Sequence, residues 1–230
     1  MKEIKKNRLI ATYSRRGARP LTDKRRDLFN TLLPEISIKL PVNLENISHI
    51  FKFSPDEIWL EIGFGGGEHI AKQAEANPNI GLIGCEVFTT GVSSLLNSIN
   101  EKKISNIRIF QDDARLLLDA LPDESINRIF ILFPDPWPKR KHHKRRLIQE
   151  SSIQTLSRVM KKGGKLRFAS DHMQYIAWTL ALMAQNKDFD FAANTAADWL
   201  NPPKDHFTTR YQIKKKTGDE PIFLDFIKNS

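Results

Sequence analysis

Apolar residues in the central part of the chain form two alternating kinds of segment. Short runs rich in Ile, Val, Leu and Phe predict buried strands, and longer segments with apolar residues three and four positions apart predict helices. Val92, Leu95, Leu96 and Ile99 have this helical spacing. The predicted strands are residues 58–62, 79–87, 106–110, 128–133, 165–170, 189–194 and 221–227, and the predicted helices are residues 68–76, 89–103, 145–160 and 172–185.

This alternation of strands and helices predicts the fold class. Strand–helix–strand units build a mostly parallel sheet with helices on both faces. We therefore expect an α/β domain over residues 31–230, with a doubly wound, mostly parallel sheet of seven strands. Residues 32–40 are bounded by prolines and are expected to be extended. Residues 1–30 hold few large apolar side chains, so we expect a flexible basic arm there.

The distribution of charge along the chain indicates what kind of partner the protein binds. The net charge is +9, and residues 1–26, 139–146 and 210–216 carry +8, +6 and +4, so the remainder of the chain is net acidic. Three basic patches on an acidic body predict a polyanionic partner, with nucleic acid as the main candidate. A solvated surface remains the alternative for any single patch.

Composition narrows the cellular setting. The longest apolar helical stretch, residues 175–184, is too short to span a bilayer, and residues 1–20 hold no continuous apolar run typical of a secretory signal. The single cysteine, Cys85, excludes an internal disulfide and fits a reducing compartment. We expect a cytoplasmic protein with no membrane segment, and the basic N-terminus leaves an organelle transit peptide as the alternative.

A glycine-rich loop follows the first strand of the predicted sheet. Gly63, Gly65 and Gly67 separate that strand from a helix, which is the context for close backbone approach to a ligand. A dinucleotide fingerprint requires glycine at position 68, where this chain has Glu68, and a carboxylate at a helix N-terminus disfavours a pyrophosphate. The loop therefore indicates a ligand without phosphates and disfavours a nucleotide-dependent oxidoreductase. A tight turn with no ligand is the alternative.

Five successive predicted strands each end near a carboxylate. The acids are Glu61, Glu86, Asp113, Asp135 and Asp171. Loop capping accounts for any one of them, but not for five at the same edge of a parallel sheet. A ligand with a positive centre and ribose hydroxyls does account for them. Glu86 is placed to accept hydrogen bonds from a ribose, and Asp113 from an adenine amino group.

These residues resemble the class I S-adenosylmethionine-dependent methyltransferases, which combine E-x-G-x-G-x-G, an acid after strand two and D-A after strand three. Residues 132–146, LFPDPWPKRKHHKRR, resemble the signature of the bacterial tRNA (guanine-N7-)-methyltransferases. Their segments EIGFG, GCEV, DDA, FPDPWPK, KRR, SDH and TRY occur here in the same order. The resemblance covers roughly residues 55–227. It implies a Rossmann-like sheet with an antiparallel last strand, S-adenosyl-L-methionine as cofactor, and methyl transfer to N7 of a guanine in the variable region of tRNA, at position 46.

The resemblance also implies residue roles. Cofactor contacts are expected from Glu61, Gly63, Gly65, Gly67, Glu86, Asp113 and Asp135, and Asp135 is also the expected catalytic residue. Substrate contacts are expected from Lys139, Asp171, Thr209, Arg210, Tyr211 and Gln212. Phosphate contacts are expected from Lys141, His142, His143, Lys144, Arg145 and Arg146. The family usually has Glu where this chain has Gln212, so a counter-charge at that position is in doubt.

The chemistry of guanine agrees with these roles. N7 carries a lone pair and no proton, so the transfer needs alignment and charge stabilisation rather than a general base. Asp135, restricted by Pro134 and Pro136, can accept from the guanine N1 or N2 hydrogens and offset the new positive charge. Trp137 either stacks on a base or is a core residue.

Three further points concern metal, catalysis and assembly. His142 and His143 are not expected to bind a metal, because no cysteine or suitably spaced acid completes a ligand set. A non-catalytic RNA-binding module on the same fold would explain the basic patches, but not the retained acids Glu61, Glu86 and Asp113. Monomer and homodimer both remain open.

Overall fold

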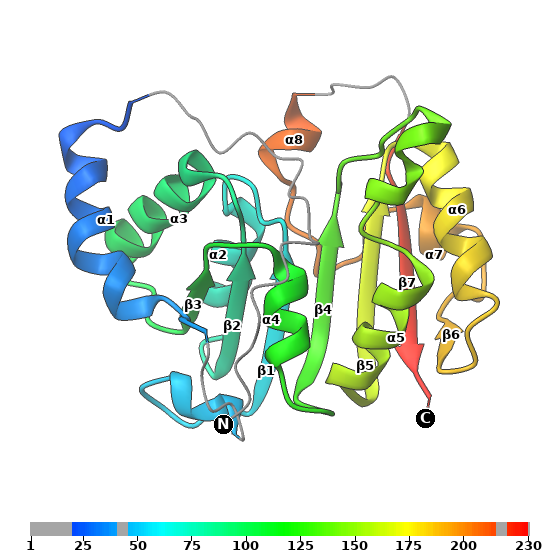
Figure 1. The fold of residues 1–230 in the computed structure, drawn as a ribbon, viewed down its shortest axis with the longest axis horizontal. Helices are drawn as coiled ribbons and strands as arrows, with labels where there is room; N and C mark the ends of the chain where they lie inside the picture. The colour runs from blue at the N-terminus through cyan, green and yellow to red at the C-terminus, as the bar shows by residue number, and fades with distance from the viewer. Residues whose placement is uncertain (1–19, 41–45, 215–219, 230) are drawn as a thin grey trace.

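The computed structural model describes residues 20–40, 46–214 and 220–229, which fold around one seven-stranded sheet (Figure 1). Its strand order is β3-β2-β1-β4-β5-β7-β6. Strand β7 pairs antiparallel with β5 and β6, and the pairs joining β1 to β5 are parallel, which confirms the predicted fold class. The strands are β1 Glu57–Ile62, β2 Ile80–Cys85, β3 Ile107–Phe110, β4 Ile126–Leu132, β5 Met160–Ser170, β6 Phe189–Phe191 and β7 Ile222–Lys228.

Helices cover both faces of the sheet (Figure 1). Helices α4, α5 and α6 pack on one face, and α1, α2 and α3 pack on the other. The helices are α1 Asp23–Ile36, α2 Glu68–Ala76, α3 Thr89–Lys102, α4 Ala114–Ala120, α5 Glu150–Val159, α6 Met173–Met183, α7 Ala197–Leu200 and α8 Arg210–Ile213, with 3-10 turns η1 Ile47–Ile50 and η2 Arg140–Arg145. None of these helices is both long and apolar enough to cross a membrane.

Strand β1 illustrates how side-chain alternation builds two cores. Ile58, Leu60 and Ile62 belong to the apolar cluster beneath α4–α6, and Trp59 belongs to the cluster beneath α1–α3. Successive side chains of a strand point to opposite faces, so a central strand buried on both faces is apolar at nearly every position. Glu61 is the buried exception in this strand, and it shares the face of Trp59.

The strand order reverses beside β1. The chain runs outward from β1 to β2 and β3, and then crosses back to place β4 on the other side of β1. Crevices for ligands form outside the carboxyl ends of the strands at such a reversal. The loops after β1 and β4 are therefore the ones that flank the expected site.

Helix α1 corrects the expectation of an extended segment at residues 32–40. Residues Asp23–Ile36 are helical although Pro34 lies inside, and Leu28 is buried against α3 with Phe29, Leu32 and Leu33 beside it. The proline suggests a boundary, whereas the apolar spacing at 28, 32 and 36 is that of a helix face. Residues 1–19 of the expected arm and Lys215–Lys216 of the third basic patch lie outside the described residues.

Two other elements begin five residues away from the predicted position. The helix expected at 145–160 begins at Glu150, because Gln149 and Ser152 form a capping box there, and η2 precedes it. Strand β5 begins at Met160 and continues through Gly163 and Gly164, where the register with β4 shifts. Helix α4 was not predicted from the sequence. Helix α2 occupies the predicted residues 68–76.

Candidate active site

The glycine loop after β1 depends on backbone conformations that glycine adopts most easily. Gly63, Gly65 and Gly67 have φ angles of 75°, 56° and 81°. Helix α3 packs so closely on this loop that a side chain at Gly91 would collide with the Gly65 carbonyl oxygen. The loop is therefore a tight, closely packed surface of backbone at the carboxyl end of β1.

Glu86 ties this loop to the end of β2. One carboxylate oxygen accepts from the Gly65 N–H at 2.8 Å, and the other accepts from the N–H groups of Val87 and Phe88 at 2.8 and 2.9 Å. The residue is 6% exposed. Burial raises its pKa, and the three backbone hydrogen bonds oppose that rise. Glu86 thus fixes the loop while it keeps a carboxylate at the sheet edge.

Glu61 and Asp113 are each held by a neighbouring helix. The Glu61 carboxylate lies 2.7 Å from Nδ1 of the buried His69 on α2. Asp113 caps α4 by accepting from the Arg115 N–H at 3.0 Å, and it pairs with the Arg115 guanidinium. Both carboxylates remain at the edge where β1 and β3 end.

The segment Phe133–Trp137, which follows β4, has a strained backbone. Phe133 and Trp137 have φ angles of 53° and 44°, in the left-handed region that bulky residues rarely adopt. Such strain is concentrated at functional sites, where the surrounding structure has to maintain it. Pro134 and Pro136 lie between these two residues and limit the motion of Asp135.

Asp135 is the most open of the five strand-end acids. Its side chain is exposed, and it has no hydrogen bond or ion pair with any other described residue. Partial desolvation by the surrounding protein nevertheless raises its pKa above the usual range. Its charge is close enough to influence Glu86 and Tyr211. The carboxylate is therefore available to a ligand, on a backbone that holds it in place.

Tyr211 of α8 connects the ends of two strands. Its hydroxyl donates to Asp171, which follows β5, at 3.3 Å. Its ring lies 5.2 Å, centroid to centroid, from the ring of Phe133 after β4. Figure 1 shows α8 beyond the carboxyl ends of the strands, so this short helix covers the site.

Gln212 faces the protein rather than the site. Its amide oxygen accepts from the backbone N–H of Thr209 at 2.9 Å, and it lies 2.9 Å from Nε2 of His206. Thr209 and Gln212 together form the capping box of α8. Burial lowers the pKa of His206 to about 4, which keeps the ring neutral at physiological pH. The neutral amide at 212 therefore pairs with a neutral histidine.

One cavity of about 260 Å³ joins these segments. Of the five strand-end acids only Glu61 lines it, while the other four follow neighbouring strands of the same edge. An ion pair of 3.0 Å between Arg210 and Glu68 links α8 to the start of α2. The lining residues are Glu61, Gly63, Phe64, Gly65, Gly66, Glu68, Leu132, Phe133, Thr209, Arg210, Tyr211 and Lys214.

The basic segment Lys139–Arg146 divides into exposed and internal members. Lys139, Lys141 and Lys144 are exposed, whereas His142, His143 and Arg145 are half-buried. Arg146 is 2% exposed, so the expected contact of its guanidinium with a phosphate is not available in this structure.

Trp137 lies beside this basic segment. It is neither a core residue nor fully open, because the Arg145 guanidinium lies over its ring at 4.9 Å and the His142 ring packs against its edge. Among the described residues, no group of three His, Cys, Asp or Glu side chains is arranged to hold a metal ion.

The sequence reasoning missed a charged cluster that supports the site. Asp205 accepts from Arg128 and Arg167 at 2.5 and 2.8 Å, and its backbone carbonyl accepts from Gln73 of α2 at 2.8 Å. Arg167 also makes two bonds of 2.7 Å to Asp225. The cluster anchors the loop that leads into α8. Arginines inside otherwise apolar strands, at positions 128 and 167, were the available signal.

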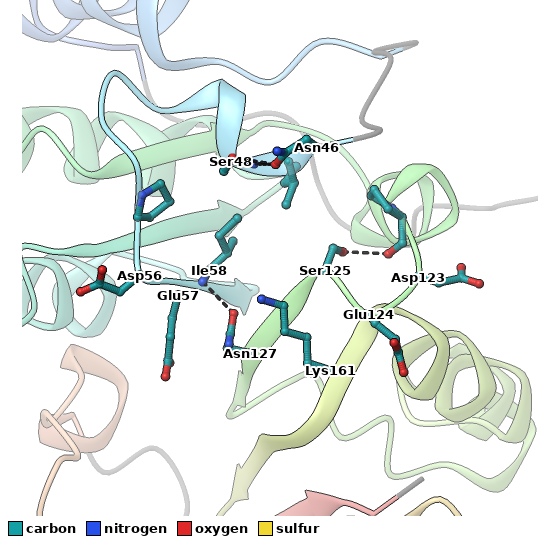
Figure 2. A pocket seen from close by; sticks show the side chains of 13 residues that line it. Asn46, Ser48, Asp56, Glu57, Ile58, Asp123, Glu124, Ser125, Asn127 and Lys161 are labelled. Atoms are coloured by element: carbon teal, nitrogen blue, oxygen red, sulfur yellow. Dashed lines mark hydrogen bonds between the residues drawn. The ribbon is translucent and has the colours of Figure 1, made fainter.

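A second cavity, of about 330 Å³, lies at the opposite edge of the sheet, where β1, β4 and β5 begin. Figure 2 shows hydrogen bonds between some of its polar groups: Ser48 donates to Asn46, and the Ile58 N–H donates to Asn127. It holds none of the strand-end acids.

Known proteins share both the sequence and the fold of this chain. Residues 55–224 match a protein family described as "Putative methyltransferase". An rRNA methylase from Streptococcus thermophilus has a TM-score of 0.53 and 14% identity, covering 76% of this chain and 89% of its own. A "putative methyltransferase" from Streptococcus mutans, solved in complex with SAH, has a TM-score of 0.52 and 10% identity over the same shares. These two structures establish the fold.

Sequence identity establishes the family. A tRNA (guanine-N(7)-)-methyltransferase of Rhodospirillum rubrum is 43% identical over 219 residues, which cover 93% of this chain and 86% of that protein. Its counterpart in Caulobacter vibrioides is 43% identical over 223 residues, which cover 95% of each. Similarity of this extent, together with the site described above, means that the chain belongs to the tRNA (guanine-N(7)-)-methyltransferase family.

Proposed function

We propose that this protein transfers a methyl group from S-adenosyl-L-methionine to N7 of a guanine in the variable region of tRNA. The observation that supports this most strongly is that three segments meet around one cavity: the glycine loop, the strained segment after β4, and α8. Family membership supplies the reaction. The acidic sheet edge and the exposed lysines of residues 139–144 fit a cationic cofactor and a polyanionic substrate.

The residues at the sheet edge fit a sulfonium cofactor that carries no phosphate. The α2 N-terminus begins with Glu68, whose carboxylate would repel a phosphate, and it pairs with Arg210 instead. When bound, the cofactor supplies an activated methyl group. Glu86 would accept from its ribose, Asp113 from its adenine amino group, and Glu61 and the glycine loop would bind its amino acid end.

The reacting guanine needs alignment and charge compensation. Its N7 would accept the methyl group directly while the methyl–sulfur bond breaks, because a lone pair is already available and no proton has to leave first. Asp135 would accept hydrogen bonds from the guanine N1 and N2 positions and stabilise the positive charge that develops on the purine. Asp171 and Tyr211 would hold the other side of the base.

Electrostatic contacts would position the tRNA. Lys139, Lys141 and Lys144 are exposed on one side of the site and would bind phosphates. The basic residues among positions 1–30 would add to this attraction, with those from Lys24 onward lying on helix α1. A tRNA is the polyanionic substrate that fits these contacts, and we include a cytoplasmic location in the proposal.

Methyl transfer to unmodified tRNA, followed by nucleoside analysis, tests the proposal. We expect 7-methylguanosine as the product and S-adenosylhomocysteine in equal amount. Methyl groups on carbon, ribose or exocyclic nitrogen would refute the assigned atom. Cofactor binding without any transfer to tRNA would favour a non-catalytic RNA-binding module.

A further inference from the structure

Arg146 differs from its neighbours in the basic segment by being internal. Lys144, two residues before it, is exposed, and Arg146 is 2% exposed. It has no ion pair with any described carboxylate. A buried guanidinium without an acidic partner is costly, so its hydrogen bonds and packing have to compensate.

The guanidinium connects two parts of the site. Its Nε donates to the carbonyl oxygen of Pro136 at 2.8 Å, and its Nη2 donates to the side chain of Gln174 on α6 at 3.1 Å. Its flat group lies over the rings of Tyr175 and Trp178 at 4.9 and 5.2 Å. Arg146 therefore bridges the segment after β4 to helix α6.

Both ends of this bridge carry residues of the candidate active site. Pro136 directly follows Asp135 and lies between the two left-handed residues Phe133 and Trp137. Helix α6 begins two residues after Asp171. A strained segment keeps its conformation only where its surroundings fix it, and the Pro136 carbonyl is bonded to Arg146.

We propose that Arg146 is a positioning residue that holds Asp135 in its reactive place, and that it does not bind tRNA phosphate. The proposal rests on the proposed function, because Asp135 has to act on the bound guanine. Its two directed N–H bonds and its flat face lying over two rings are features of guanidinium that an ammonium group does not reproduce.

The test compares Arg146→Lys and Arg146→Gln with Lys144→Ala and with Lys162→Ala, an exposed cation at the opposite edge of the sheet. Each variant is measured for kcat and KM with tRNA, for cofactor affinity by calorimetry, and for the salt dependence of tRNA affinity. A small displacement of a reacting group costs on the order of 10- to 100-fold in rate. We expect kcat of both Arg146 variants to fall by about that factor, with cofactor affinity and salt slope retained. Lys144→Ala should flatten the slope.

Three outcomes would overturn the proposal. The first is a flattened salt slope and a raised KM for the Arg146 variants, as for Lys144→Ala. The second is an unchanged kcat of the Arg146 variants. The third is a reduction of their kcat that is no larger than that of Lys162→Ala. If the Arg146 variants fail to bind cofactor because they misfold, Gln174→Ala tests the other end of the bridge and should lower kcat about 3- to 10-fold, with an unchanged kcat rejecting the proposal. The wild-type protein is assayed in parallel. If the proposed function is wrong, the wild type itself will not methylate N7, whereas failure of the positioning proposal leaves wild-type methylation intact.

Discussion

The two edges of the sheet each have a cavity, and the smaller one lies at the candidate active site. The cavity at the amino ends of the strands has about 330 Å³ and the one at the carboxyl ends about 260 Å³. Some polar groups around the larger cavity bond to one another, as Ser48 and Asn46 do (Figure 2). At the carboxyl edge Asp135 is left without a described partner, and the backbone beside it is strained.

If the proposed function is correct, the size of a cavity does not identify the site in this α/β sheet. Carboxyl ends of parallel strands lead into loops that bring together residues from distant parts of the chain, and here they bring together the glycine loop, Asp135 and α8. At the amino edge some of the lining polar atoms bond to one another, as the Asn127 side chain does with the Ile58 N–H. Matched substitutions at the two edges test this interpretation, from the largest expected effect to the smallest.

The largest effect is expected at Asp135. Removing one group that stabilises developing charge costs about 100- to 1000-fold in kcat, and we expect Asp135→Ala to lose this much turnover while cofactor affinity changes far less. Asp56→Ala removes an exposed acid at the rim of the amino-edge cavity and should leave both unchanged. Single-turnover methyl transfer measures the rate of the chemical step, and calorimetry measures cofactor affinity. Equal losses of binding and turnover at Asp135 would make it a cofactor residue only.

The next effect is expected at Glu86. Glutamine offers one acceptor oxygen where the carboxylate receives three backbone N–H groups, so Glu86→Gln should loosen the glycine loop. Removing a hydrogen bond to a charged group costs about 1.5–3 kcal/mol, which corresponds to cofactor affinity about 10- to 100-fold weaker. Glu124→Gln at the amino edge is the control. The affinity of the wild-type protein for the cofactor should also fall as the pH decreases through the pKa of Glu86, which burial raises. Equal affinities of the two variants would contradict the assignment.

A smaller effect is expected from the exposed lysines. Each lysine–phosphate interaction that is removed should lower the slope of log affinity against log salt by about 1, so Lys141→Ala with Lys144→Ala should lower it by about 2. Lys161→Ala with Lys162→Ala, at the amino edge of the sheet, removes the same charge from the opposite edge and should not change the slope. Filter binding of tRNA from low to moderate salt measures it. A slope that falls equally for both sets would indicate only general charge attraction.

The smallest effect is expected from the pH dependence of stability at Asp205. Burial alone would raise its pKa, but hydrogen bonds and charge from Arg167 and Arg128 outweigh burial and lower the pKa to about 2. A carboxyl whose pKa falls on folding stabilises the protein above its ordinary pKa, and this contribution is lost as pH falls toward 2.

The free energy of unfolding of Asp205→Asn should therefore differ from that of the wild type less at pH 3 than at pH 7. We expect the difference in unfolding free energy between wild type and variant to shrink by about 1 kcal/mol from pH 7 to pH 3. This figure allows for solvent screening, because the side chain is 44% exposed. Urea unfolding at both pH values measures it, and Asp56→Asn is the amino-edge control. A difference that stays constant with pH would show that Asp205 does not act through its charge.

The sequence predicted the elements whose pattern is local. Apolar spacing gave helix α2 at its observed bounds and placed every strand of the sheet, because buried positions along a strand or helix repeat with a fixed period. Helix α1 was missed because Pro34 suggested a boundary, although a helix tolerates a proline when packing of its apolar face compensates. The strand-end acids could be found because parallel strands align their ends.

The sequence by itself thus determined the family, the fold class and the set of acids at one sheet edge. Only the tertiary structure decided which cations face solvent and which face the protein. Lys144 and Arg146 belong to the same basic run, but α6 packs against Arg146, and Gln212 turns toward His206. The burial of a side chain depends on elements that are distant in the sequence, and a local pattern of charge does not contain that information.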